Sequence, residues 1–347
     1  MVALISRLQR MDKLEIIFKI HKFLRKKSFY FPDYFIYPVL NYLGFHLIRV
    51  FFYEYSNKFI KLFWKYRNLQ ISMEVEKKGF CAVPDFFDEK TKADFDKHYH
   101  SLFAVPVEVL RNKKLLHNHN NQVTRINITS DNFKTHESAT FIYNLFKNLK
   151  LFREVGSDIL NMDLNYGPTI QLEAFKVPID QTDYYDHNHS LHADRSCHCI
   201  RFFYFPDETK KENGTYQYVP FSHHMNLKRI QFEWKKSIRF ANQFIQAGFD
   251  REKLFEQFNH LERVSEADIK WMNYEVLPLE VKANTMAMSD NRGFHRRGVI
   301  TPGKGRNLLH FCYYHTHKSY FWYFLWSIWK FIFARELRLY KASVNLK

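Results

Sequence analysis

The stretch Leu191-His192-Ala193-Asp194 decides the fold that the rest of the sequence predicts. It places an imidazole and a carboxylate two positions apart, and alternate residues of an extended strand project to the same side. A second imidazole, His295, follows about a hundred positions later, in Gly293-Phe294-His295. Two imidazoles and one carboxylate in this order are typical of a metal site in which three side chains hold one face of an octahedral ion and leave three positions open.

A basic residue downstream makes the pattern more specific. Arg306 stands eleven positions after His295, where a guanidinium on the next strand can bind a carboxylate through two parallel hydrogen bonds. The ligand set itself is that of non-haem Fe(II) oxygenases. The sequence therefore predicts that His192, Asp194 and His295 bind a metal ion and that Arg306 binds a carboxylate. The alternative is a set of core and surface residues that binds no metal.

Three further segments extend the pattern: Arg201-Phe-Phe-Tyr-Phe-Pro-Asp207, Glu212-Asn-Gly-Thr-Tyr-Gln-Tyr-Val-Pro-Phe-Ser-His-His224, and the segment from Gly293 to Arg306. Together with the His-x-Asp motif they resemble the phytanoyl-CoA dioxygenase family of Fe(II)/2-oxoglutarate-dependent oxygenases, over roughly residues 70 to 316. The resemblance implies an α+β fold, with a double-stranded β-helix (jelly-roll, cupin-like) core flanked by helices.

The resemblance also implies the chemistry of the site. His192, Asp194 and His295 would hold Fe(II), the co-substrate 2-oxoglutarate would occupy two of the open positions, and O₂ would take the last. Arg306 would pair with the far carboxylate of 2-oxoglutarate. The expected reaction is hydroxylation of an unactivated C–H bond. Because Asp194 supplies the carboxylate that related halogenases lack, we expect hydroxylation over halogenation.

The loop before the motif holds rival metal ligands, namely Asp186, His187 and His189. We favour the His-x-Asp motif because it stands immediately before a strand predicted over residues 199–205. A second polar group, His117 and His119, lies within residues 111–136, which show no clear period. We expect a polar loop there and no second metal site.

Composition divides the chain into three parts. Residues 1–70 predict a basic, amphipathic and aromatic N-terminal helical segment,. Residues 71–316 predict the oxygenase domain, and residues 317–347 an aromatic, basic C-terminal helix. Within the domain, residues 225–272 are charged and show helical spacing, so they predict a helical insertion between strands. This insertion is either part of a substrate lid or a solvated helical face.

Positive charge is concentrated at the two ends of the chain. The net charge is +16. Residues 1–70 hold 13 Lys and Arg against 4 Asp and Glu, a balance of +9, and residues 318–347 hold 6 against 1, a balance of +5. Because these basic residues are interleaved with Phe, Trp, Leu and Ile, the pattern favours an anionic membrane surface over nucleic acid as the partner.

The run at residues 319–333 is the most apolar in the chain and holds three Trp and two Tyr. At about 1.5 Å per residue, a helix of this length covers about 22 Å, which is short of a hydrocarbon core of about 30 Å. Since Trp and Tyr prefer the membrane interface, we expect an interfacial helix. The alternative is a helix buried against residues 29–52.

The cysteines form no CxxC pair and predict no disulfide framework; they are Cys81, Cys197, Cys199 and Cys312. Residues 1–10 have no apolar segment typical of a secretory signal, so the expected location is the cytoplasm, at the periphery of a membrane. The expected substrate is a small or lipid-linked molecule, and the pattern gives no indication of the oligomeric state. The alternative is a protein without turnover, either a jelly-roll protein that binds a glycan or lipid or a membrane-docked scaffold.

Overall fold

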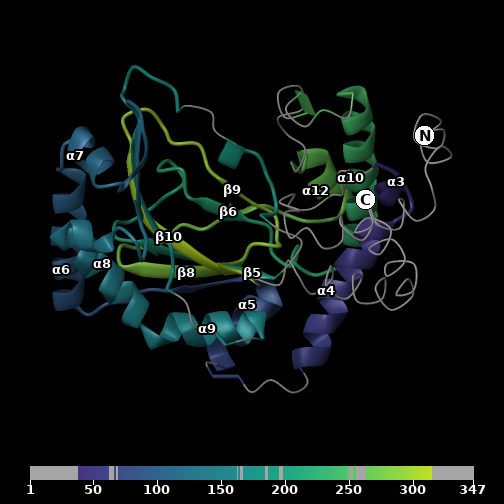
Figure 1. Cartoon of the computed structure of the whole chain (residues 1–347), viewed down its shortest axis with the longest axis horizontal. Coiled ribbons are helices and arrows are strands. Elements are labelled where there is room, and N and C mark those ends of the chain that lie inside the picture. The colour runs from purple at the N-terminus through teal and green to yellow at the C-terminus, as the bar shows by residue number, and fades with distance from the viewer. Residues whose placement is uncertain are drawn as a thin grey trace, which may run out of the picture. The chain divides into compact units, whose positions relative to one another are not determined.

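The structure is a computed structural model of the chain (Figure 1). It describes residues 38–61, 66–67, 69–161, 163–164, 167–183, 187–194, 198–248, 250, 253–254 and 263–314. The described residues fall into two compact units. The first comprises those from 38 to 55 and from 233 to 254, and the second those from 56 to 232 and from 263 to 314. The predicted helices before residue 38 and over residues 317–347 lie outside the described residues.

Two antiparallel sheets form the centre of the second unit. Within the described residues, the larger sheet has seven strands in the order β1-β8-β5-β10-β4-β3-β2, and the smaller has three in the order β7-β6-β9. Neighbouring strands are antiparallel throughout both sheets. The strands are β1 (Phe80–Val83), β2 (Leu116–His119), β3 (Val123–Ile128), β4 (Ile170–Lys176), β5 (Cys199–Phe205), β6 (Tyr216–Tyr218), β7 (Leu277–Pro278), β8 (Thr285–Asp290), β9 (His295–Arg297) and β10 (Gly305–Tyr314).

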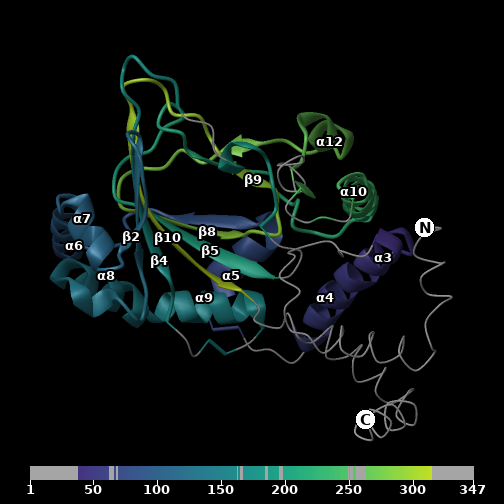
Figure 2. The ribbon, with the colours of Figure 1, turned by 45° about the horizontal axis from the view of Figure 1, so that its top comes forward.

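Helices cover one face of the larger sheet (Figures 1 and 2). Helix α6 packs against α8, α5 against β1, and α9 against β5. The start of α6 is fixed by a cap, because the carboxylate of Asp88 accepts a hydrogen bond of 2.8 Å from the backbone N–H of Thr91,. The helices of this unit include α5 (Leu69–Lys78), α6 (Glu89–Phe103), α7 (Val107–Asn112), α8 (Glu137–Asn148), α9 (Lys150–Leu160) and α12 (Glu266–Trp271), with short 3₁₀ turns at Phe133–Thr135 and His187–His189.

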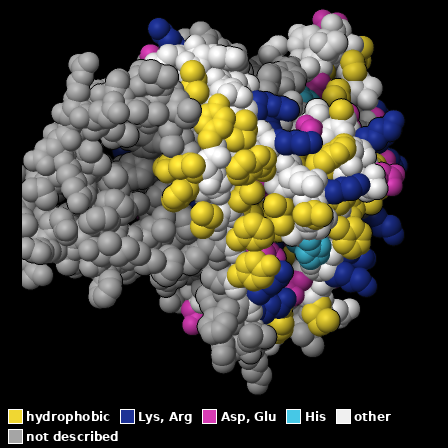
Figure 3. Space-filling model, turned by 90° about the vertical axis from the view of Figure 1, so that its right-hand side faces the viewer, with side chains coloured by type: hydrophobic (Ala, Val, Ile, Leu, Met, Phe, Trp, Pro, Cys, Tyr) yellow, Lys and Arg dark blue, Asp and Glu magenta, His cyan; other side chains and the backbone are white. Residues whose placement is uncertain are grey.

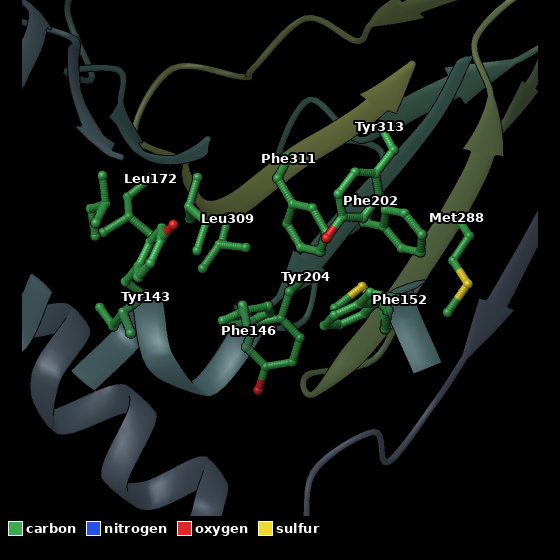
Figure 4. Packing of buried hydrophobic residues seen from close by; sticks show 14 of the residues in the cluster. Tyr143, Phe146, Phe152, Leu172, Phe202, Tyr204, Met288, Leu309, Phe311 and Tyr313 are labelled. Carbon is green, nitrogen blue, oxygen red and sulfur yellow. The ribbon is translucent and has the colours of Figure 1, made fainter. Parts of the chain in front are cut away.

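The face of the larger sheet toward the helices carries a buried cluster rich in aromatic residues. Phe202 of β5 and Phe311 of β10 stack with their ring centroids 4.9 Å apart (Figure 4). Phe152 of α9 meets the ring of Phe311 edge-on at 4.9 Å and that of Phe202 at 5.1 Å. These contacts join the helix layer to the two central strands and form the main core of the unit.

The opposite face of the same strands meets the smaller sheet. Successive side chains of a strand project to opposite sides, so β5 turns Arg201 and Phe203 away from the helices. The ring of Phe203 lies 4.5 Å from that of Tyr216 in β6, within a small cluster that also includes Leu308 of β10. This second face carries the charged residues Arg201 and Arg306, and it is the side on which the candidate site is built.

The first unit is helical in its described residues. It contains α3 (Pro38–Tyr42) and parts of α4 (Phe45–Lys61) and α10 (Leu227–Gln246). Three polar side chains form a buried network there: Nε2 of His46 lies 3.0 Å from a carboxylate oxygen of Glu233, and Nη2 of Arg49 lies 2.9 Å from Nδ1 of His46. None of the described helices has the length and apolar character that crossing a bilayer requires,.

The predicted combination of helices with strands is confirmed, with a large antiparallel sheet, and the strand predicted over residues 199–205 coincides with β5. The prediction of a loop over residues 111–136 is wrong, because these residues contain β2 and β3. In β3, Val123 and Ile126 are buried as in any strand. Of the two polar residues between them, Arg125 is paired with Glu173 of β4 at 2.8 Å. Because this ion pair forms only in the folded chain, the strand pattern is not evident from the sequence.

Candidate metal centre

A backbone bridge brings the two distant parts of the predicted ligand set together. The N–H of His192 donates to the carbonyl of His295 at 3.0 Å, and the N–H of His295 donates to the carbonyl of His192 at 2.9 Å. Asp194 is fixed in the same way, since its N–H donates to the carbonyl of Asn291 at 2.9 Å. The side chains of the three predicted ligands therefore start from one short stretch of antiparallel pairing.

The side chains of His192, Asp194 and His295 converge. Their ligand atoms all lie within 4.8 Å of one another. Nε2 of His192 is 3.5 Å and Nε2 of His295 is 3.4 Å from the same oxygen, Oδ1 of Asp194. The two imidazole rings are 4.4 Å apart, centroid to centroid. The structure thus places three nitrogen and oxygen donors around one point.

Each imidazole is held through its other nitrogen. Nδ1 of His192 lies 2.8 Å from the carbonyl of Ser190, and Nδ1 of His295 lies 2.9 Å from the carbonyl of Gly293. A carbonyl oxygen can only accept, so both Nδ1 atoms carry the proton and donate it. The lone pair is then on Nε2, which faces Asp194. Metal-ligating histidines are oriented in this way, by a carbonyl on the nitrogen that does not bind the metal.

The electrostatics favour the protonation states that a metal requires. Burial, together with the nearby His295, lowers the pKa of His192 to about 4, so the imidazole of His192 is neutral at pH 7. Burial alone would raise the pKa of Asp194, but the charge of Arg201 and the two imidazoles hold it well below its usual range. Neutral imidazole and ionised carboxylate are the forms that bind metal ions.

The residues present fit a six-coordinate metal. Metal–nitrogen and metal–oxygen bonds of about 2.1 Å put two neighbouring ligands of an octahedron about 3 Å apart. The observed separations of 3.4 and 3.5 Å between Asp194 and the two imidazoles are close to that value. Two imidazoles with one carboxylate are also the donors that suit Fe(II) among the first-row metals.

Two residues that the sequence analysis gave no role lie next to Asp194. Nη2 of Arg201 is 2.7 Å and Nδ2 of Asn291 is 2.8 Å from Oδ2, the carboxylate oxygen that does not face the imidazoles. The amide of Asn291 is also 3.1 Å from Nε2 of His295. The only sequence signal for Asn291 is its place four positions before His295.

Arg306 lies on the face of β10 that meets the smaller sheet, here called the inner face. It is opposite Phe175 of β4 and is almost completely buried. Its guanidinium lies 5.3 Å from the centre of the Phe175 ring, donates to the carbonyl of Gly214, and has Nη2 3.9 Å from a carboxylate oxygen of Glu173. Two more guanidinium groups lie over the same ring, those of Arg125 at 5.3 Å and Arg297 at 4.8 Å. This part of the inner face is therefore strongly basic.

The rival ligands occupy other positions or lie outside the described residues. Nε2 of His189 is 3.0 Å from Asp183, which also accepts a hydrogen bond of 2.8 Å from Arg297. His189 therefore contacts the buried ion pair of Asp183 and Arg297, which ties its loop to β9. Asp186 is not among the described residues, and neither is the side chain of His187.

Comparison with solved structures shows distant likenesses. AviO1 from Streptomyces viridochromogenes Tue57 is 13% identical, with a TM-score of 0.44, and the match covers 73% of this chain and 97% of that one. HygX from Streptomyces hygroscopicus, with nickel and 2-oxoglutarate bound, is 13% identical with a TM-score of 0.42, covering 72% and 88%. EctD from S. alaskensis, with bound Fe, is 13% identical with a TM-score of 0.44, covering 72% and 79%. None of these likenesses identifies a substrate or a reaction of this chain.

A family model matches the sequence itself, whereas no individual curated protein does. A search of the curated proteins returned no match. The model of the family described as Phytanoyl-CoA dioxygenase (PhyH) matches residues 75–285. That match contains His192, Asp194 and the strand β5, and it ends ten residues before His295. Because it spans more than half of the sequence, the chain belongs to the phytanoyl-CoA dioxygenase family.

Proposed function

We propose that this protein is a non-haem Fe(II)- and 2-oxoglutarate-dependent dioxygenase that hydroxylates an unactivated C–H bond of a small or lipid-linked substrate. The observation that carries the proposal is the convergence of His192, Asp194 and His295, with both imidazoles oriented by backbone carbonyls. Membership of the phytanoyl-CoA dioxygenase family agrees with it. Bound Fe(II), together with 2-oxoglutarate and O₂, supplies the oxidising chemistry.

The residues of the site have distinct parts in this proposal. His192, Asp194 and His295 hold Fe(II) on one face, and Arg306 donates hydrogen bonds to the far carboxylate of 2-oxoglutarate. The carboxylate of Glu173 is shared, because it lies 2.8 Å from Arg125 and 3.9 Å from Arg306. The guanidinium of Arg306 is therefore well placed for the carboxylate of a co-substrate.

The finer features of the proposal follow from the same residues. Asp194 fills the position that a halide would take in a halogenase, which supports hydroxylation as the reaction. The two sheets and the bridge between His192 and His295 support a double-stranded β-helix as the core of the domain. We place this oxygenase domain at residues 71–316, with residues 225–272 as a helical insertion that includes α10 and α12.

We also propose that the protein lies in the cytoplasm at the surface of an anionic membrane. On α10, Trp234 and Ile245 are partly exposed next to the exposed basic residues Lys235 and Arg239. Figure 3 draws one face of the molecule, on which hydrophobic side chains lie next to lysine and arginine side chains. Apolar side chains with basic neighbours suit an interface with anionic lipids, and a substrate held in the membrane would then be within reach.

The metal centre can be tested by spectroscopy without knowing the substrate. Fe(II) and 2-oxoglutarate added to the protein under anaerobic conditions should produce a weak visible charge-transfer band. The variant His192→Ala should lose the band, because one of the three ligands is gone. The matched control His119→Ala, at an exposed position of β2, should keep it.

Two outcomes decide between the proposal and its alternative. A wild-type protein without the band, or a His192→Ala variant with an unchanged band, would contradict the proposal. A wild-type protein without the band would fit the alternative of a jelly-roll protein that binds a glycan or lipid. A protein that shows the band but forms no succinate from 2-oxoglutarate in air would be a membrane-docked scaffold without turnover.

A further inference from the structure

Arg201 lies beside the candidate metal centre and has so far been described only as the partner of Asp194. It sits in β5, opposite Cys312 of β10 and Ser289 of β8, on the face of the sheet that bears the site. Its Nη2 lies 2.7 Å from Oδ2 of Asp194. The other carboxylate oxygen, Oδ1, is the one that faces the imidazoles. Arg201 therefore contacts the same carboxylate as the two imidazoles, at its other oxygen.

The guanidinium of Arg201 has donors beyond the one that Asp194 takes. An arginine carries five N–H donors. Within the part of the chain that the structure describes, Nε of Arg201 is buried and has no hydrogen-bond partner. A buried donor without an acceptor is costly and uncommon in native proteins. We take it as the place of an acceptor that belongs to a ligand.

The side chain of Arg201 is more exposed to solvent than the three predicted metal ligands. It is 28% exposed, against 16% for Asp194, 11% for His192 and 4% for His295. Arg201 is therefore the residue of this group with the most solvent contact, while the imidazoles are almost completely buried.

The charges of the loaded centre favour an additional anion. Asp194 pairs with Arg201 at 2.7 Å, and in the function proposed above the same carboxylate would also hold Fe(II). Its single negative charge would then be shared between the metal and Arg201. A buried or half-buried charge of this kind is stable when a counter-charge lies beside it.

We propose that Arg201 binds an oxyanion next to the metal, a carboxylate or a phosphate, through the N–H groups that Asp194 does not occupy. The inference rests on the proposed function and adds a substrate class to it. The oxyanion has two possible sources. It is either an acid group of the primary substrate, which makes the substrate a carboxylic acid or a phosphate ester, or the metal-bound carboxylate of 2-oxoglutarate itself.

Titration calorimetry on the full chain tests this. The protein is loaded with Ni(II), a metal that does not turn over, and titrated with N-oxalylglycine, an unreactive mimic of 2-oxoglutarate. Acetate and inorganic phosphate are then titrated into the ternary complex as probes of the second anion site. If the oxyanion is an acid group of the substrate, the wild type should bind one of the two probes, and Arg201→Gln should weaken that binding at least about tenfold, because paired charge-assisted hydrogen bonds are lost.

Two further variants separate a specific role from a general one. Arg201→Lys keeps the charge without the fork of the guanidinium, so it should retain part of the probe binding; it also replaces Arg201→Gln if that variant does not fold. Arg296→Gln is the matched control, because it removes one arginine next to His295 whose side chain pairs with Gln217 and Glu266 instead. It should bind Ni(II), N-oxalylglycine and the probe as the wild type does.

The outcomes distinguish the two sources from each other and from failure. If Arg201→Gln weakens N-oxalylglycine about tenfold at unchanged Ni(II) affinity, the oxyanion is the metal-bound carboxylate of the co-substrate. If it changes only the Ni(II) affinity, or nothing, the inference is overturned and Arg201 merely orients Asp194. A wild-type protein that binds neither Ni(II) nor N-oxalylglycine overturns the proposed function, and this inference with it.

Discussion

Two buried histidines show that the surroundings of a residue determine its role. Burial lowers the pKa of both His192 and His223 to about 4, so both are neutral at pH 7. His192 turns its unprotonated nitrogen toward Asp194, at 3.5 Å. His223 instead donates from Nε2 to the carbonyl of Glu76 at 2.8 Å, which ties the end of α5 to the segment after β6. The same protonation state therefore supports a metal site in one case and a structural bond in the other.

His223 predicts a measurable loss of stability in acid. The unfolded chain binds this proton with the ordinary histidine pKa of 6.5, above the folded value of about 4, so stability is lost as the pH falls from 6.5 through 4,. At pH 5 the cost should be about 2 kcal/mol of the free energy of unfolding. Urea denaturation should show that the free energy of unfolding of the wild type decreases between about pH 7.5 and pH 5. In His223→Gln this decrease should be smaller by about 2 kcal/mol. The exposed control His100→Gln should behave as the wild type, and the same pH effect in both variants would speak against the account.

The site residues that could be predicted from the sequence are those related by short spacing along the chain. His192 and Asp194 are two positions apart on an extended segment, and His295 and Arg306 are eleven positions apart around one turn. The partners of Asp194 depend on tertiary pairing. Arg201 reaches Oδ2 from β5, which no spacing along the chain encodes, since an arginine in a hydrophobic strand is equally compatible with a surface ion pair.

At the scale of elements, one helix secures the two central strands that flank the site. Phe152 of α9 is fully buried against Phe202 of β5 and Phe311 of β10, with ring centroids 5.1 and 4.9 Å apart. Phe152→Ala should lower the free energy of unfolding by about 3–5 kcal/mol, because it removes the ring and leaves a cavity. Chemical denaturation measures this. The control Ile179→Ala, at a side chain that is 86% exposed, should change stability by less than about 0.5 kcal/mol, and a comparable loss in both variants would show that α9 does not anchor the sheet.

The strands differ in how far their pattern reveals them. β5 has near-continuous hydrophobic residues and is predicted from sequence with its correct ends. β3 is not predicted from sequence, because its inward residue is Arg125, a charged residue that pairs with Glu173 of β4. Burial would raise the pKa of Glu173, but His310, Arg125 and Arg306 together hold it below its usual range, so the carboxylate stays ionised inside the unit. A strand that buries a charge in this way has the composition of a loop.

At the scale of the whole molecule, charge and apolar surface occur together. The two ends of the chain carry +14 of the net charge of +16. In the described residues, α10 presents Lys235 and Arg239 next to the partly exposed Trp234. An anionic lipid surface attracts such a helix through its charges and retains it through its apolar side chains. The membrane proposal therefore predicts binding that depends on both the lipid charge and these basic residues.

Sedimentation with vesicles tests that prediction. The full chain should pellet with vesicles that contain phosphatidylserine and stay in solution with phosphatidylcholine alone. Removing two basic residues in Lys235→Gln/Arg239→Gln should cost about 2 kcal/mol of binding free energy, roughly thirtyfold in the partition coefficient, since each contributes about 1 kcal/mol near such a surface. The control Lys90→Gln/Lys97→Gln removes the same charge from exposed positions of α6 and should have little effect. Equal losses in the two variants would mean that net charge alone acts, and a wild type that never pellets would remove the membrane from the proposed function while leaving the metal centre untouched.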